Sequence, residues 1–544
     1  MRRILFLLLL PLFCGMVSCT RGGGEPTEAP QALIVGAYVN GNLFTASWAL
    51  GGIPAGTCEI VVEFSHEVSV DPASLARVLF TGGELTARVG EDPTCLVFTP
   101  VNPLASFRTY QLTIPSGEIF GVELLKSFSC SFTTIAGDSD QFPRISTDEL
   151  LTKVQQQTFK YFWDYAHPVS GLARERLGSD NTVTTGGSGF GIMTLPVAVE
   201  RGFITRDEGA ARLRTIVTFL SEKADRFHGA FSHWLDGETG KAIPFSAKDD
   251  GGDLVETAFL IEGLLTAAQY FDAASEADIR SGIDAIWRAV EWDWYTRGGQ
   301  DVLYWHWSPD QGWAMNMKIS GWNEALIVYV LAASSPTHSI SKTVYDKGWA
   351  RSGGIRNGKK FYDITLPLGS DYGGPLFFTH YSFLGLDPRN LKDAWCASYW
   401  DQNVAHARIN HAYCVANPGK HAGYGDACWG LTASDIPKGY TASSPTNDKG
   451  VIAPTAALAS FPYTPSESLK ALEYFYYKLG DKLWGDYGFY DAFCLDQAWF
   501  APSYIAIDQG PIVVMIENYR SGLLWRLFMQ NTDVSAGLGK LGFQ

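Results

Sequence analysis

The chain has 544 residues, more than one hydrophobic core usually covers, so its length predicts two domains. Hydrophobic residues make up 46% and charged residues 18%, which is ordinary for a soluble globular protein. The formal net charge of -15 disfavours nucleic acid and anionic membrane surfaces as partners, whereas a neutral substrate would be indifferent to it. Of seventeen tryptophans all but Trp48 lie after residue 150, so the aromatic residues are concentrated in the second part of the chain.

The first nineteen residues are typical of an export signal. Arg2 and Arg3 precede an apolar stretch over residues 4–13, which is too short for a stable transmembrane span. Ser18 directly before Cys19 resembles a bacterial lipobox, which predicts a signal peptide over 1–19, lipidation of Cys19 and a tether over 20–30. The alternative is an ordinary secretory signal cleaved nearby. Either predicts export, and the lipobox predicts a lipid anchor in the bacterial cell envelope, at the periplasmic or surface face of the outer membrane.

Nine cysteines are present, and removal of Cys14 and Cys19 with the signal would leave seven. An odd number scattered through a long chain is no disulfide framework, although one pair among Cys58, Cys95 and Cys130 could bridge. The later cysteines lack C-x-x-C spacing, so we expect no structural zinc site and mainly buried free thiols.

Residues 31–136 alternate short apolar runs with turn residues, which predicts a small antiparallel sandwich. The run VVEFSHEVSVDPASL and the closing SFSCSFTT resemble bacterial immunoglobulin-like domains. We expect a spacer or lid here, with glycan binding as the alternative. The predicted strands cover residues 59–64, 78–81, 95–98, 110–114 and 128–133.

Residues 137–146 are the predicted linker, and from 147 to 544 the apolar spacing is helical. About twelve helices joined by long loops favour an (α/α)6 barrel of six hairpins, whose inner helices point their starts into one cavity. A helical solenoid is the alternative, but no repeat of constant length is visible. The fold class is therefore mainly α, preceded by the small all-β sandwich. The expected helices cover residues 147–165, 189–200, 205–226, 253–273, 276–295, 320–334, 340–350, 373–384, 389–416, 451–461, 465–480 and 510–529.

Nucleotide-binding and common hydrolase motifs are incomplete. The run GGIRNGKK from Gly353 lacks the final Ser or Thr of a phosphate loop, and GGSGFG from Gly186 has the wrong glycine order for a dinucleotide fold. No H-E-x-x-H or G-x-S-x-G occurs, so zinc protease and serine hydrolase activities lack support. We expect no metal and no cofactor.

One loop, residues 249–256, places a row of carboxylates directly before an apolar stretch. Glycoside cleavage needs one carboxylic acid to protonate the leaving oxygen and a second carboxylate to activate water or attack the sugar. Asp253 and Glu256 are also spaced as a helix-capping box, in which Glu256 would turn back to the backbone.

Four further acidic residues have structural alternatives. Glu324 at a helix start could favour the helix dipole or bind sugar. Asp387 before Pro388 could cap the next helix, whereas capping explains Asp435 less well. Glu517 could form a buried ion pair with Arg520 or contact substrate.

Six blocks in order resemble the bacterial glucoamylase-like family, grouped largely with glycoside hydrolase family 144. They are DGGDLVETAFLIEGLL, GWNEALIVYVLAASSPTH, PLFFTHYSFLGLDPR, WGLTASD, APTAALASFPYTP and DQGPIVVMIENYRSGLLW. The likeness covers nearly all of 147–543 and implies an (α/α)6 barrel that hydrolyses β-1,2-glucan with inversion and without metal. By the same resemblance Glu256 falls at the acid, with Asp253 also eligible because this loop departs from the family pattern, and Asp435 is the candidate base.

We therefore expect an exported, monomeric glycoside hydrolase with Glu256 as general acid and Asp435 as base. An α-glucan glucoamylase and a surface glycan-binding lipoprotein without catalysis are the alternatives. The side chains expected to bind sugar, by stacking or hydrogen bonding, are Trp234, Trp322, Glu324, His380, Asp387, Trp429, Glu517 and Tyr519.

Overall fold

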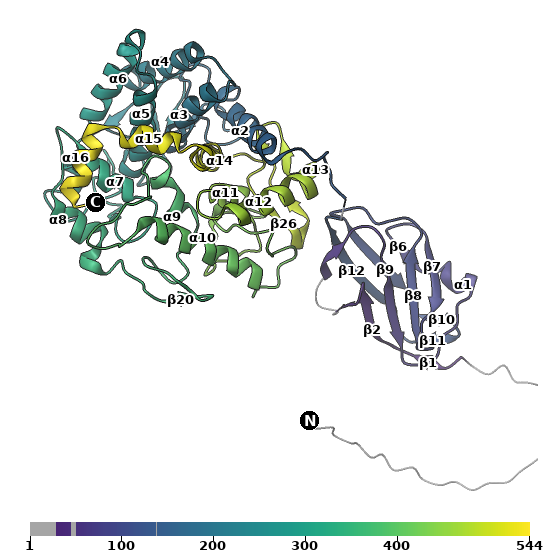
Figure 1. Cartoon of the computed structure of the whole chain (residues 1–544). Coiled ribbons are helices and arrows are strands. Elements are labelled where there is room, and N and C mark those ends of the chain that lie inside the picture. Colours follow the sequence, from purple (N-terminus) through teal and green to yellow (C-terminus); the bar gives the residue numbers. More distant parts are fainter. Residues whose placement is uncertain (1–28, 45–49, 138) are drawn as a thin grey trace, which may run out of the picture. The chain divides into compact units, whose positions relative to one another are not determined.

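A computed structural model describes residues 29–44, 50–137 and 139–544 (Figure 1). Cys19 and the predicted signal and tether up to residue 28 lie outside the described residues. The chain forms two compact units, of which the smaller takes the described residues up to 44 with Thr57–Asn102 and Gln111–Ser131. The larger takes Pro103–Tyr110, Phe132–Gln544 and the described residues of 49–56.

The N-terminal region is built of strands, as expected for an immunoglobulin-like sandwich. A five-stranded sheet has the order β3-β2-β5-β8-β7, a four-stranded sheet β4-β12-β9-β6, and a three-stranded sheet β1-β11-β10. The strands are β1 Gln31–Ala32, β2 Ile34–Val39, β3 Asn42–Leu43, β4 Leu50–Pro54, β5 Ile60–Phe64, β6 Leu79–Phe80, β7 Leu85–Val89, β8 Cys95–Pro100, β9 Thr109–Ile114, β10 Gly117–Ile119, β11 Val122–Leu124 and β12 Phe128–Ile135.

Period-two burial explains why these segments pair as strands. In β5 the side chains of Ile60, Val62 and Phe64 are buried and alternate with partly exposed ones. This strand pairs antiparallel with β2 and with β8, so its apolar face lies at the centre of the larger sheet. All five predicted strands are present. A short helix, α1 Pro72–Leu75, begins where the Asp71 side chain accepts from Ser74 N.

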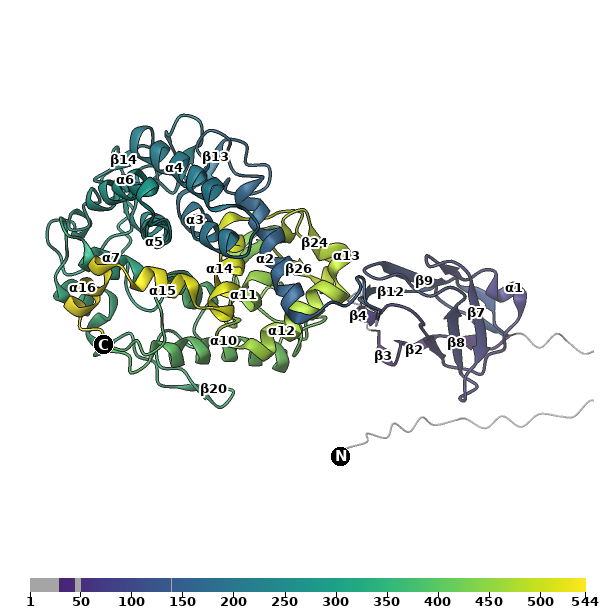
Figure 2. The ribbon, with the colours of Figure 1, turned by 45° about the horizontal axis from the view of Figure 1, so that its top comes forward.

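The larger unit is mostly helical (Figure 2), and its helices form an outer and an inner set that alternate along the chain, which confirms the predicted fold class. The outer members are α2 Thr147–Trp163, α4 Arg206–Glu222, α6 Ala277–Arg288, α8 Lys342–Val344, α10 Tyr399–Ala416 and α12 Pro465–Glu473. The inner members are α3 Thr185–Glu200, α5 Leu254–Tyr270, α7 Leu326–Ser334, α9 Phe377–His380, α11 Pro454–Leu458 and α14 Ala506–Arg520.

Composition decides which helix is inner. Helices α3, α5 and α7 are apolar around their whole circumference and nearly fully buried, whereas α4 has one apolar stripe and an exposed charged face. The inner helices close a ring: α3 packs on α5 and α14, α5 on α7, α7 on the turn Tyr381–Phe383 that continues α9, and α11 on α14. His380 Nε2 lies 3.0 Å from Ser460 Oγ, which joins α9 to the turn after α11.

Glycine allows α3 and α5 to touch backbone to backbone. A Cβ on Gly189 would lie 2.2 Å from the carbonyl oxygen of Phe259, and one on Gly263 would lie 2.1 Å from that of Gly189. The Gly-rich run from Gly186 is therefore a helix-packing element, which fits its failure as a nucleotide motif.

Two expected helices are interrupted. The helix expected over 389–416 begins only at Tyr399, where Ser398 accepts from Asp401 N, because Asn390 is left-handed with φ 60°. The helix expected over 510–529 is two helices, since Gly522 adopts φ 68° between α14 and α15 Leu523–Met529. Two helices were not predicted from the sequence, α13 Gly480–Leu483 and α16 Thr532–Leu541.

Among the described residues no helix combines the length and apolarity needed to cross a bilayer. The seven described cysteines are free, and all but Cys95 are buried.

Short paired strands and single turns of helix order the long loops of the larger unit. The strands are β13 Thr182–Thr184, β14 Arg226–Phe227, β15 Ala230–Phe231, β16 Trp234–Asp236, β17 Ala242–Ile243, β18 Gly252–Asp253, β19 His306–Trp307, β20 Lys360–Phe361, β21 Ile364–Thr365, β22 Ala433–Ile436, β23 Gly439–Ala442, β24 Trp484–Gly485, β25 Gly488–Phe489, β26 Phe493–Cys494 and β27 Trp499–Phe500. The short turns are η1 Ala274–Glu276, η2 Trp294–Thr296, η3 Tyr345–Trp349, η4 Arg351–Gly353, η5 Tyr381–Phe383, η6 Tyr474–Lys478 and η7 Leu495–Gln497.

Candidate active site

A cavity of about 360 Å³ opens where the inner helices of the larger unit begin. Thr184 precedes α3, Glu256 lies in the first turn of α5, Glu324 precedes α7, Phe377 starts α9 and Ile505 precedes α14. Helix starts carry partial positive charge and favour carboxylates nearby. The other lining residues are largely aromatic or charged, as a sugar site requires: Glu175, Arg176, His233, Trp234, Phe245, Val255, Phe259, Trp305, Tyr381, Ala433, Tyr440 and Ile507.

In the first turn of α5, one carboxylate caps the helix and the other faces the cavity, an assignment that the sequence left open. Asp253 caps the helix, because its Oδ1 accepts from Val255 N and Glu256 N, each at 2.9 Å. Glu256 does not turn back to complete a capping box. Its Oε2 instead accepts from Gly186 N of α3 at 2.7 Å, and its side chain lines the cavity. A Cβ on Gly186 would lie 2.6 Å from that oxygen, so glycine is required for this approach.

The environment of Glu256 keeps a proton on its carboxyl near neutral pH. Burial, helped by the negative charge of Asp253, raises its pKa to about 7 against the opposing charge of His233. Burial raises the pKa of Glu324 to about 7 as well. The cavity therefore holds two carboxyl groups that can act as proton donors near neutral pH.

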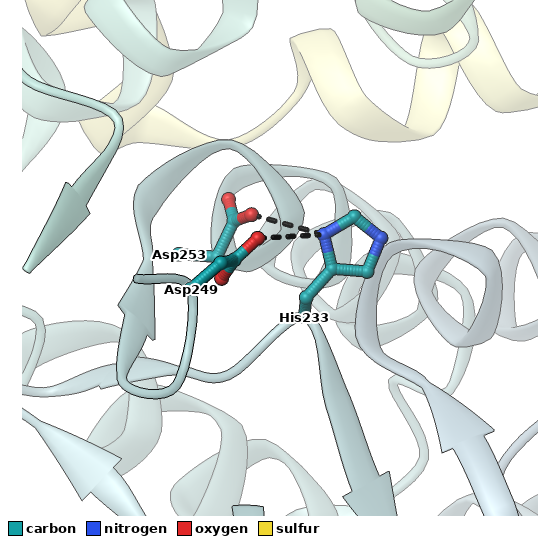
Figure 3. A group of neighbouring side chains, drawn as sticks. All are labelled: His233, Asp249 and Asp253. Atoms are coloured by element: carbon teal, nitrogen blue, oxygen red, sulfur yellow. Dashed lines mark hydrogen bonds and ion pairs between the residues drawn. The ribbon is translucent and has the colours of Figure 1, made fainter. Parts of the chain in front are cut away.

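Asp253 belongs to a buried cluster of two carboxylates and two histidines behind Glu256. Its Oδ2 lies 3.2 Å from His233 Nδ1, 3.1 Å from His306 Nε2 and 3.3 Å from Trp305 Nε1 (Figure 3 shows His233 with both aspartates). Asp249 Oδ2 lies 2.8 Å from His306 Nε2. Burial alone would raise the pKa of Asp253, but the charges of His306 and His233 and the hydrogen bond with His233 hold it well below its usual range. Asp253 is thus an ionised structural group that cannot donate a proton.

We interpret this cluster as an ion-pair network. Burial opposes charge on the histidines, yet the surrounding carboxylates raise the pKa of His233 to about 9 and that of His306 to about 10. Two cationic rings then balance two carboxylates. Within the described part of the chain, His233, Asp249 and Asp253 are the group close enough to share a cation. The nitrogens of His233, His306 and Trp305 already surround Asp253 Oδ2, and we assign no metal there.

Asp435, the expected base, lies on β22 beside the cavity. Its carboxylate lies 3.1 Å from Arg176 Nη1 and accepts from Ser503 Oγ at 2.6 Å. Arg176 lines the cavity, and Asp435 itself is not among the lining residues. The Asp435 amide donates to the carboxylate of buried Asp491, and burial raises the pKa of Asp491 to about 7.

Two of the eight expected sugar-binding residues, Trp234 and Glu324, line the cavity. Three others are buried in the packing of the barrel. Trp322 packs against Phe383 and Tyr399, and Trp429 donates through Nε1 to the carbonyl of Glu467. Burial lowers the pKa of His380 to about 3, so this ring is neutral.

The remaining three are also placed away from the cavity. The Asp387 carboxylate accepts from the amide and guanidinium of Arg389, which forms a local turn and not a helix cap. Glu517 does form a buried ion pair, but with Arg201 and not Arg520, because α14 faces the end of α3. The Tyr519 side chain is exposed.

Sequence reasoning missed several lining residues, namely His233, Phe245, Trp305, Tyr381 and Tyr440. Most of them come from the long loops 227–252, 297–319 and 417–450. The run Trp305-His306-Trp307 within the second loop was a usable signal, since aromatic residues alternate with a histidine there.

A family model described as "Putative glucoamylase" matches residues 316–532. An exo β-1,2-glucooligosaccharide sophorohydrolase (non-reducing end) of Parabacteroides distasonis is 49% identical over 421 residues, 73% of this chain. The match spans 58% of the length of that curated relative.

Solved structures resemble the larger unit closely. A protein from Bacteroides uniformis, described as a putative glucoamylase, is 60% identical with a TM-score of 0.73, over 74% of this chain and 99% of that one. An endo-β-1,2-glucanase from Chitinophaga pinensis, solved with sophorotriose and glucose, is 54% identical with a TM-score of 0.72, over 74% and 99% of the two chains.

Proposed function

We propose that this chain, which belongs to the bacterial glucoamylase-like family, is a glycoside hydrolase that cleaves β-1,2-glucan or its oligosaccharides. The observation that carries the proposal is Glu256, a carboxyl protonated near neutral pH that faces an aromatic-lined cavity. The names of the relatives from Parabacteroides distasonis and Chitinophaga pinensis support the β-1,2 linkage.

Glu256 is the proposed general acid, which protonates the leaving glycosidic oxygen. Such an acid must carry its proton at the working pH, and burial of Glu256 supplies that condition. Asp253 is set aside for this role because its pKa lies well below its usual range. Glu324 has the same raised pKa in the same cavity and is the rival acid.

Asp435 is the proposed base, which would take a proton from the attacking water in an inverting reaction. Its carboxylate is oriented by Arg176 and Ser503, and Arg176 also contacts Glu175. Arg176, which lines the cavity, holds the Asp435 carboxylate beside it.

A glycan panel tests the substrate class. Release of reducing ends is measured with β-1,2-glucan, β-1,2-glucooligosaccharides and starch oligosaccharides. We expect hydrolysis of the first two alone. Hydrolysis of starch oligosaccharides alone would favour the α-glucan glucoamylase that the family description names, and no hydrolysis at all would refute the proposal.

We also propose export and lipidation at Cys19, on the basis of the basic, apolar and Ser18-Cys19 segments. The test is fractionation of cells that express the full chain. Wild type should partition with membranes, and Cys19→Ala should not be lipidated. Equal membrane association and lipid labelling of both would refute the anchor.

A further inference from the structure

His233 is bound to the chain segment that supplies the Gly186 amide, which donates to Glu256. It lies between β15 and β16, and its carbonyl accepts from Thr185 N at 3.1 Å, one residue before Gly186. The ring stacks on Phe245 with centroids 4.3 Å apart and planes at 23°. Backbone and ring contacts therefore leave this side chain little freedom.

The two ring nitrogens of His233 face two carboxyl groups from the first turn of α5. Nδ1 lies 3.2 Å from Asp253 Oδ2, and Nε2 lies 4.0 Å from Glu256 Oε1. Asp253 is fully buried, while Glu256 borders the cavity. One imidazole thus lies between the buried ion-pair network and the carboxyl that faces the cavity, with Nδ1 at hydrogen-bond distance from Asp253 and the ring within electrostatic range of Glu256.

We propose that His233 is a positioning residue whose charge, anchored by Asp253, sets the pH range over which Glu256 keeps its catalytic proton. The inference rests on the proposed function, in which Glu256 is the general acid. It assigns His233 no contact with the reacting atoms.

The groups around Glu256 give the direction of the effect. His233 is the cation that faces it, and Asp253 and Asp249 are anions whose charges favour its protonated form. Glu324 before α7 and Tyr381 in η5 also couple electrostatically to it, and Gly186 N favours its ionised form. Arg176 and Glu175 line the same cavity as a mutual ion pair. Loss of the His233 charge would leave burial and the two aspartates unopposed, so the Glu256 carboxyl should hold its proton to higher pH.

The test is the pH profile of kcat/KM for β-1,2-glucooligosaccharides with wild type, His233→Gln and His233→Lys. For two charges 4.0 Å apart, we expect His233→Gln to move the alkaline limb upward by about one pH unit or more. His233→Lys returns a positive charge and should move the limb back toward wild type. A role in packing alone would lower kcat/KM at every pH without moving the limb.

His306→Gln is the matched control. It removes a cation from the same network, but its ion-pair partners are Asp249 and Asp253 and not Glu256. The alkaline limb of its kcat/KM profile should move less than that of His233→Gln. Thermal melting of each variant checks that the fold is retained.

An unmoved limb in a folded His233→Gln, or an equal shift in His306→Gln, would overturn the inference while leaving the proposed function intact. Full activity of Glu256→Gln would instead overturn the proposed role of Glu256 as general acid, and no hydrolysis by wild type would overturn the proposed function. The two failures are therefore distinguishable.

Discussion

The ion pair of Glu517 provides a direct test of whether this residue is structural or binds sugar. Its Oε1 and Oε2 each accept from the Arg201 guanidinium at 2.8 Å, and Gln155 and Ser521 donate two further bonds. Glu517→Gln keeps the size of the side chain and removes its charge. The Arg201 guanidinium, three-quarters buried, then loses its counter-charge.

Removal of one partner from a buried ion pair costs about 3–5 kcal/mol. The partial exposure of Arg201 places our expectation at the lower end, about 3 kcal/mol. The assay is scanning calorimetry of the larger unit together with KM for β-1,2-glucooligosaccharides. We expect the melting temperature to fall by several degrees and KM to stay unchanged.

Glu517→Met with Arg201→Met is the control, because replacing both partners with apolar side chains should recover part of the lost stability. An unchanged melting temperature with a raised KM in Glu517→Gln would refute the ion-pair account. It would restore the sugar contact that the sequence left open.

Three further predictions concern pH, packing and redox state. The pKa of about 7 at Glu256 predicts that kcat/KM falls about tenfold per pH unit above that pH, since a general acid is lost as its proton leaves. A profile that stays flat up to about pH 9 would contradict the assignment. Gly189→Ala should destabilise the larger unit by about 1–3 kcal/mol, because its Cβ would lie 2.2 Å from Phe259 O. Gly539→Ala, at a helical position with nothing within 4 Å, should leave stability unchanged or raise it, and equal calorimetric effects of the two substitutions would argue against close α3–α5 packing. The melting temperature of the protein should be the same with and without a thiol reductant, because the seven described cysteines are free, and a fall of several degrees on reduction would show a disulfide among them.

Local sequence predicted those features whose causes lie within a few residues. Ser146 and Glu149 form a reciprocal capping box at the start of α2, close to the expected boundary. The sequence also predicted that Asp253 and Glu256 lie at the same helix start, but it left open which of them caps the helix and which faces the cavity. The helix limits failed where one residue reversed the backbone, as at Asn390 and Gly522.

Partners that come from distant segments could not be predicted in the same way. Glu517 pairs with Arg201, which is 316 residues away in the chain and brought near by the packing of α14 on α3. Trp322 and Trp429 had the aromatic character of a sugar platform, yet the helices bury both. Composition identifies aromatic side chains, and tertiary packing decides which of them reach the cavity.

The most direct test of the account is the kcat of Glu256→Gln on β-1,2-glucan, measured beside Glu324→Gln and wild type. If Glu256 is the general acid, Glu256→Gln loses at least about 10²–10⁴-fold in kcat and keeps its fold, while Glu324→Gln retains more activity. Wild-type turnover by Glu256→Gln, or a larger loss in Glu324→Gln, would contradict the central claim.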